Sequence, residues 1–290
     1  DLDEDLTVHV PTWRPHADHP VVLIEDVARL IGYNKIPVAS SSAAPTLGER
    51  CRMDRVRQAV AQQLVASGFF ETRNPSLESP QMSRWLGEPT PVVTVTNAQS
   101  VEMSVARRSL LPSLARTVDG NVRRGAERVR FFEIDRAFDP HGDTAPQDAP
   151  NSDRWRVAAM AGGLSQVSEW RGEKPIDFHA VKGVVEDLFD ALRCPRGEYV
   201  AIAAPPFVAG AAAEIRWGER RVGVLGQVAP EVVGIDRLAF KLYGLELDLH
   251  AIEELYAEGA TYRHLSRQPA VTRDVAIIVP LSVAYGDLET

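Results

Sequence analysis

The stretch AEIRWGERRVGVLGQV, residues 213–228, decides the fold class. Two alternating runs of apolar and polar residues flank Gly218 and Glu219, and a short glycine-containing loop between such runs is typical of a β-hairpin. Further on, YGLELDLHAIEEL (residues 243–255) predicts another alternating strand that runs into a short helix. Strands joined through hairpins indicate an antiparallel sheet with flanking helices, an α+β fold, rather than the regular βαβ alternation of a doubly wound sheet.

Three amphipathic helices are predicted to pack on this sheet. The strongest helical periodicity lies in IDFHAVKGVVEDLFDALRCP, with Asp177 as its N-cap and Pro195 after its end. Two other helices stop at Gly68 and Gly125, since glycine accepts the left-handed turn that often follows a helix. Their apolar stripes are, in chain order, Met53, Val56, Val60 and Leu64; Leu111, Leu114, Val118 and Val122; and Phe178, Val181, Val185, Leu188, Phe189 and Leu192.

A separate piece is predicted before residue 40. LTVHVPTW reads as a strand, and a helix is predicted from about Pro20 to Ile31, with proline in its first turn and Gly32 at its end. IPVASSSAAPTLG then reads as a linker rich in small residues. We therefore expect a domain boundary near residue 40.

Composition limits the classes of protein that fit. The chain has 290 residues with 44% hydrophobic content, enough to bury one large core or two ordinary ones. No apolar run approaches the roughly 18–20 residues of a membrane span, and Cys51 and Cys194 lack metal or redox spacing. We expect a soluble, cytoplasmic protein, and the start at Asp1 within an expected strand suggests a fragment of a longer chain.

Charge leaves two interpretations open for one arginine-rich segment. The net charge of -8 argues against a module that coats a nucleic acid, yet eight arginines fall between Arg107 and Arg136. A solvated helix face beside a strand is the favoured interpretation, because basic runs usually lie in water. An RNA-facing patch is the alternative.

Motifs for catalysis are missing from the sequence. It contains neither GxxxxGK[ST] nor GxGxxG, and Ser109 has no nucleophile-elbow context. None of the seven histidines pairs with another at a metal-binding spacing. Glu25 and Asp26 are adjacent on the first helix, where neighbours point about 100° apart, so a solvated face is the default interpretation of this pair.

Three stretches, in order, carry a resemblance to one family. They are PTWRPHADHPVVLIEDVARLIGYNKIP, SVARRSLLPSLARTVDGNVRRG with the following VRFFEIDRAF, and SRQPAVTRDVAIIVP. Together they resemble the β subunit of bacterial phenylalanyl-tRNA synthetase. The resemblance implies the C-terminal part of a B5 domain at 1–40, a class II synthetase-like core at 41–262, and the start of a truncated ferredoxin-like anticodon-binding domain at 263–290.

That family implies an α2β2 ligase in which the α subunit activates phenylalanine with ATP and magnesium. The β core would then be a non-catalytic scaffold that binds the α subunit and contacts tRNA, without a cofactor of its own and without catalytic residues. The sequence agrees, because it lacks the GxGxGxxR string that commonly supplies the phosphate-binding arginine. A free-standing paralogue acting as an adapter is the alternative.

The resemblance also implies two sites. The end of the family's B5 domain presents acidic residues associated with magnesium; the matching positions here are His16, Val22, Glu25 and Asp26. Glu25 and Asp26 remain as metal-site candidates, and with two of four acids replaced we expect the shared magnesium site to be lost. The stripe of Met53, Val56, Val60 and Leu64 is the candidate subunit interface, packed either inward or against a partner.

Overall fold

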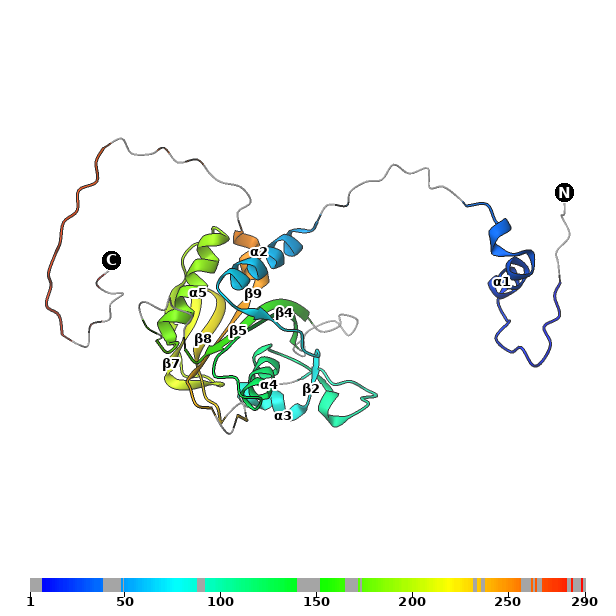
Figure 1. Ribbon diagram of the computed structural model, residues 1–290, viewed down its shortest axis with the longest axis horizontal. Helices are drawn as coiled ribbons and strands as arrows, with labels where there is room; N and C mark the ends of the chain where they lie inside the picture. The colour runs from blue at the N-terminus through cyan, green and yellow to red at the C-terminus, as the bar shows by residue number, and fades with distance from the viewer. Residues whose placement is uncertain are drawn as a thin grey trace. The chain divides into compact units, whose positions relative to one another are not determined.

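The computed structural model describes residues 7–38, 48, 50–87, 92–139, 152–164, 172, 174–231, 234–235, 238–256, 262, 264, 268–280, 283 and 288. The chain divides into two compact units, Asp1–Glu49 and Arg50–Thr290 (Figure 1). Each unit is described by itself. Within the described residues, no helix combines the length and apolar character that crossing a membrane requires.

In its described residues, the first unit has one α-helix, α1 (Pro20–Ile31), followed by the 3₁₀ turn η1 (Tyr33–Lys35). The predicted helix is confirmed: proline occupies its first turn, and Gly32 ends it with a φ of 93°. The ring of His19 caps α1 by accepting a hydrogen bond from the Val21 backbone N–H. The predicted strand before it is wrong over residues 7–10, which form no ladder with another strand.

The second unit is built on a seven-stranded sheet in the order β1-β4-β5-β9-β8-β7-β6. All neighbouring pairs are antiparallel except β1 with β4, which confirms the α+β class. Gly218, with a φ of 59°, turns β7 into β8 at the predicted hairpin. The strands are β1 (Phe70–Glu71), β4 (Val129–Asp139), β5 (Ser152–Gly162), β6 (Glu198–Ala201), β7 (Phe207–Trp217), β8 (Arg220–Val228) and β9 (Leu242–Asp248).

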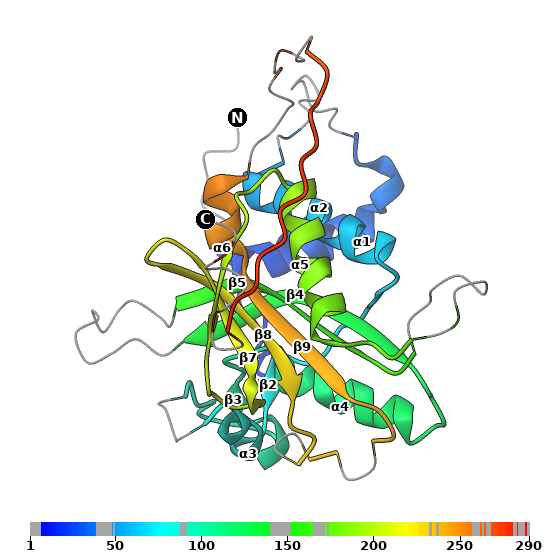
Figure 2. The same cartoon turned by 90° about the vertical axis from the view of Figure 1, so that its left-hand side faces the viewer.

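Three helices cover one face of the sheet: α2 (Arg52–Ala66), α5 (Phe178–Ala191) and α6 (Leu249–Leu255) (Figure 2). The side chain of Asp177 caps α5 by accepting from the Ala180 N–H, as predicted. The stripe proposed as a subunit interface lies in this chain's own core, so these side chains present no surface to a partner here. Their exposed fractions are 8% for Met53, 0% for Val56, 0% for Val60 and 1% for Leu64.

The opposite face carries α4 (Leu111–Val122), and near it lie the short helix α3 (Pro80–Ser83) and the two-stranded sheet of β2 (Leu77–Glu78) and β3 (Val105–Ala106) (Figure 2). The 3₁₀ turns η2 (Arg84–Leu86) and η3 (Val101–Met103) complete this layer. The apolar stripe of α4 packs with Val129, Met160 and Leu242 in a second core. Gly125 follows α4 with a φ of 92°, the left-handed conformation expected after the helix.

This second face is apolar along only part of each strand. Side chains alternate between faces, so on β4 Val129 and Phe131 pack in the α4 core, and Glu133 and Asp135 follow on the same side. The same change occurs on β5, where Arg156 follows Ala158 towards the strand start. The sheet therefore offers a charged area beside α4.

Candidate functional site

A row of three buried glutamates crosses the charged half of this sheet face. Pairing register aligns Glu133 with Ala158, Ala158 with Glu246, Glu246 with Val224, and Val224 with Glu214. The three glutamates are only 1%, 8% and 9% exposed, in the order Glu133, Glu246 and Glu214. Buried carboxylates require partners that satisfy their charge, and here each one has an arginine.

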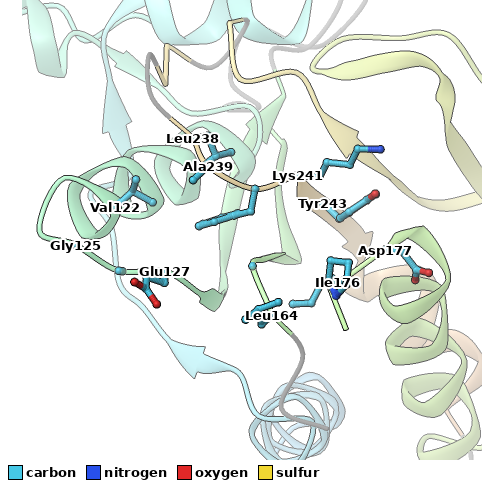
Figure 3. Close-up of a pocket in the computed structure, with 14 residues that line it drawn as sticks. Val122, Gly125, Glu127, Leu164, Ile176, Asp177, Leu238, Ala239, Lys241 and Tyr243 are labelled. Carbon is cyan, nitrogen blue, oxygen red and sulfur yellow. The ribbon is translucent and has the colours of Figure 1, made fainter. Parts of the chain in front are cut away.

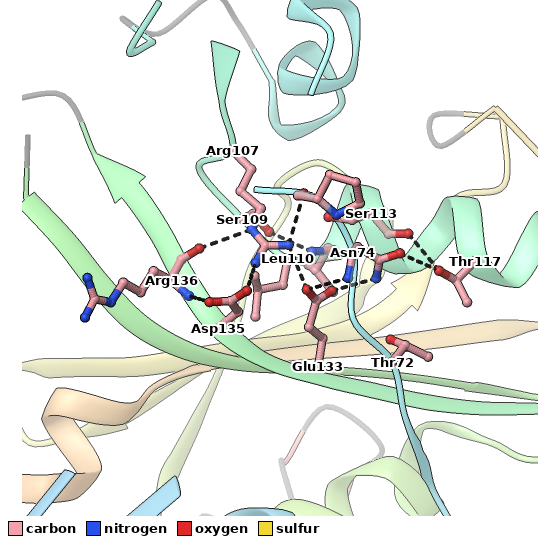
Figure 4. A network of polar contacts seen from close by, with 12 residues as sticks. Thr72, Asn74, Arg107, Ser109, Leu110, Ser113, Thr117, Glu133, Asp135 and Arg136 are labelled. Atoms are coloured by element: carbon pink, nitrogen blue, oxygen red, sulfur yellow. Dashed lines mark hydrogen bonds and ion pairs between the residues drawn. The ribbon is translucent and has the colours of Figure 1, made fainter. Parts of the chain in front are cut away.

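Glu133 is held by Arg107, whose side chain is fully buried. Arg107 Nη1 lies 2.8 Å from Glu133 Oε1, and its Nη2 lies 2.8 Å from Asp135 Oδ2. Asn74 adds two donors to Glu133: its backbone N at 3.1 Å and its Nδ2 at 2.7 Å (Figure 4). Thr117 of α4 in turn donates to Asn74 Oδ1 at 2.9 Å. The network joins the sheet, the segment before β2 and α4.

Glu246 sits at the centre of the row and receives donors from the start of α4. Ser109 Oγ donates to its Oε1 at 2.9 Å, and the Leu110 backbone N–H donates to the same oxygen at 2.7 Å. Arg156 Nη1 lies 3.1 Å from the other oxygen, Oε2. Burial lowers the pKa of Arg156, but the charges of Glu246 and Asp139 outweigh it and raise this pKa overall. Arg156 therefore remains a cation.

Glu214 lies at the far end of the row and is paired twice. Arg216 Nε contacts its Oε1, and Arg221 Nε lies 3.2 Å from its Oε2. Both arginines are more exposed than the carboxylate they hold, with side-chain exposures of 41% and 62% against 11%. This end of the row opens towards solvent.

Two cavities lie on this face, of about 440 and 280 Å³, and both are lined by Arg156, Arg221, Val224 and Glu246. Each lining arginine has a carboxylate oxygen within 4 Å. Among the described residues lining them, Ser109 carries the sole hydroxyl, and it donates to the buried carboxylate of Glu246, which also pairs with Arg156. The arrangement has the hollow of a ligand site, but its charges are satisfied within the chain.

A third cavity, about 1110 Å³ and larger than the two on the charged face, lies elsewhere, at the ends of α4 and β5 (Figure 3). Its walls are mainly apolar, and the ionisable side chains among its lining residues are those of Glu127, Asp177, Lys241 and Tyr243. Burial, then the charge of Asp177, raises the pKa of Tyr243. Gly163 shapes one wall, since a Cβ there would lie 2.3 Å from the Glu127 carbonyl oxygen.

The two metal-site candidates, Glu25 and Asp26, are both engaged by arginines of the first unit. Arg29 Nη2 lies 2.6 Å from Glu25 Oε1, and Arg14 Nη1 lies 2.7 Å from Asp26 Oδ2. The hydrogen bond from Arg14 lowers the pKa of Asp26. In the parts of the chain that the structure describes, no group of three or more His, Cys, Asp and Glu side chains converges. These residues do not fit a magnesium site, and the predicted loss stays a prediction.

The buried ion pairs were missed by reasoning from the sequence. Arg107, Arg156, Glu133 and Glu246 all stand in runs that read as arginine-rich or alternating segments. One signal was present: charged residues at alternate positions of strands that otherwise read as core. Their partners are distant in sequence, with Ser109 and Glu246 separated by 137 residues.

Solved structures define the class of this fold. The chain is similar to the pyrrolysyl-tRNA synthetase PylSc of Desulfitobacterium hafniense, with a TM-score of 0.51 and 15% identity over 69% of this chain and 65% of that one. Another structure of pyrrolysyl-tRNA synthetase from this organism gives a TM-score of 0.50 and 13% identity over 69% and 67%. At these identities the likeness concerns the fold, which is that of class II tRNA synthetases.

The chain belongs to the phenylalanyl-tRNA synthetase β chain family. Residues 36–249 match the family described as phenylalanyl tRNA synthetase beta chain CLM domain. The phenylalanine–tRNA ligase beta subunit of Symbiobacterium thermophilum is 33% identical over 99% of this chain, and that of Bacillus subtilis is 32% identical over 100%. The chain spans about a third of the length of these relatives, 32% and 36% respectively.

Proposed function

We propose that this chain is the synthetase-like region of a phenylalanine–tRNA ligase β subunit and serves as a non-catalytic scaffold for the α subunit. The observation that carries the proposal is the charged sheet face. Every arginine lining its two cavities lies within 4 Å of a carboxylate of the same chain. The family to which the chain belongs indicates that the scaffold is part of a phenylalanine–tRNA ligase.

Amino-acid activation places negative charge on phosphoryl groups, and catalysis of that step needs preorganised positive charge at the reacting atoms. Arg156 forms an ion pair with Glu246, and Arg221 forms one with Glu214, so their charge is not directed at a ligand. ATP and magnesium would therefore be used by the α subunit in an α2β2 enzyme, with tRNA as the second substrate, in the cytoplasm.

The domain assignment is part of the proposal. Residues 1–40 would be the C-terminal part of a B5 domain, 41–262 the core and 263–290 the start of the anticodon-binding domain. The compact unit Asp1–Glu49 supports the first of these divisions. In the first unit the ion pairs of Arg14 and Arg29 support a loss of magnesium binding at Glu25 and Asp26, because a bound cation would have to displace both guanidinium groups.

The test is co-expression of the complete β subunit with the α subunit of the same organism, followed by pull-down and aminoacylation of tRNA. We expect a stable complex that charges tRNA with phenylalanine. A β subunit that binds no α subunit yet retains another protein partner would favour the adapter alternative. Magnesium titration of the chain, with E25Q as the control, checks the metal proposal: a sub-millimolar affinity removed by this substitution would contradict it.

A further inference from the structure

The two cavities on the charged face adjoin each other, since they share four lining residues, and together they are called the charged hollow. Arg108, Arg154, Arg156 and Arg221 contribute four cations to its walls, and Asp139, Glu246 and Asp248 contribute three anions. Clustered guanidinium groups in a concave site are the usual means of binding phosphate. What separates this hollow from an anion site is the presence of carboxylates of the same chain.

Arg156 is the most enclosed of these cations, with a side-chain exposure of 20%. Its Nη2 lies 2.8 Å from Asp139 Oδ2, and its Nη1 lies 3.1 Å from Glu246 Oε2 and 2.9 Å from the Arg108 carbonyl oxygen. Both terminal nitrogens thus donate to oxygens of the same chain. A phosphate bound by a guanidinium fork would offer two oxygens to the same nitrogens.

The carboxylates of Glu246 and Asp139 differ in their burial and in the number of hydrogen bonds that hold them. Glu246 is buried and also accepts from Ser109 Oγ and the Leu110 N–H, so it is a structural part of the sheet face. Asp139 is the last residue of β4, and its side chain is 32% exposed. Its Oδ1 lies 3.8 Å from Arg108 Nη2, so one carboxylate spans two arginines at the wall of the larger cavity.

We propose that Asp139 is a built-in substitute for an anionic ligand and that it closes this hollow to polyphosphates by occupying Arg156 and Arg108. The inference deepens the proposed non-catalytic role, because it names the residue that keeps the synthetase-like face from binding a nucleotide's phosphates. Removing its charge should open a site for a polyphosphate without adding any new cation.

The experiment measures pyrophosphate binding to the 290-residue chain by calorimetry at low salt, for the wild type, D139N and D153N. Asn has the shape of Asp, so D139N removes one charge with little change in packing. Asp153 is the matched control: it pairs with Arg136 at 2.6 Å, is 42% exposed and lines neither cavity. We expect D139N to bind pyrophosphate about tenfold or more tightly than the wild type, since each charge-assisted bond is strong, and D153N to match the wild type.

The gained affinity should disappear in D139N/R156Q and should weaken with added salt. Should D139N fail to fold, D139A tests the same idea, because it also removes the carboxylate that pairs with Arg156 and Arg108. Wild-type binding as tight as that of D139N would overturn the proposal. So would the absence of any gain in pyrophosphate affinity in a folded D139N or D139A. Neither result depends on the α subunit, so a failed complex in the co-expression test remains a separate outcome.

Discussion

Arg107 shows how one residue ties this face together. Its guanidinium is fully buried between Glu133 and Asp135, and its Nε donates to the Arg136 carbonyl at 3.1 Å. Replacing it with methionine would leave Glu133 as a buried carboxylate without its countercharge. We expect R107M to lower the free energy of unfolding by about 3–5 kcal/mol, measured by urea denaturation.

The double variant R107M/E133Q separates charge from packing, because it also removes the stranded carboxylate. It should recover part of the stability lost in R107M. Arg136 offers a surface control, as its pair with Asp153 is half exposed; D153N should cost no more than about 1 kcal/mol. Equal decreases in the free energy of unfolding for R107M and D153N would show that the buried ion pair contributes no more to stability than the exposed one.

The buried side chain of Glu78 predicts that the stability of the fold depends on pH. It is 3% exposed, and burial raises its pKa although Ser83 Oγ donates to Oε1 at 2.7 Å. The native chain therefore keeps this proton over a range in which the unfolded chain releases it, so stability falls as pH rises from the unfolded to the folded pKa. E78Q, which does not titrate, should gain stability relative to the wild type as the pH rises above about 4, the unfolded pKa.

Thermal unfolding followed across that pH range checks this prediction. E71Q is a suitable control, because Glu71 is exposed at the end of β1, and its curve should parallel that of the wild type. Parallel curves for E78Q and the wild type would contradict the prediction.

At the scale of elements, α2 offers a matched pair of valines. Val60 is fully buried beneath the sheet and Val65, on the same helix, is 57% exposed. V60D would bury an unpaired charge and should cost several kcal/mol, on the order of 3–5 kcal/mol, whereas V65D should change stability by less than about 1 kcal/mol. The melting temperatures of the two variants test this prediction. Similar decreases would mean that the apolar stripe of α2 does not hold the helix on the sheet.

Two glycines give opposite expectations for the same substitution. At Gly223, in β8, a Cβ would lie 2.3 Å from the Glu246 carbonyl oxygen of β9, so G223A must push the central strands apart. At Gly183, inside α5, nothing lies within 4 Å, so G183A should stabilise the helix by about 0.5–1 kcal/mol. Denaturant midpoints should therefore fall for G223A and rise for G183A; a rise for both would show that the strands can yield.

For the whole molecule, the neutralised sheet face predicts a chain that does not activate amino acids. Arg154, Arg156 and Arg221 have carboxylate partners at 2.7, 2.8 and 3.2 Å, so the charge of these three arginines is not directed at a phosphoryl transition state. We expect no phenylalanine-dependent pyrophosphate exchange by the purified chain above a buffer blank. Exchange that survives in R156Q would point to a contaminating synthetase; exchange lost in R156Q would refute the prediction.

Much of the fold follows from local patterns. Pro20 and Gly32 mark the ends of α1, Asp177 caps α5, and Gly218 turns β7 into β8 as predicted. These features depend on residues within one or two turns of each other, which is why the sequence reveals them. The stripe of α2 was also visible, but the pattern alone left open whether its own sheet or a partner covers it.

The sequence by itself determined the α+β class, the positions of the main helices and the resemblance to the synthetase family. Only the tertiary structure decided the charged face: Glu133, Glu246 and Glu214 meet in one row because the registers of five strands align them. The strands show charged residues at alternating positions, and within one strand such residues read as exposed side chains. Burial and ion pairing arise from contacts between residues far apart in sequence, such as Ser109 and Glu246 at a separation of 137, and no local rule encodes such pairs.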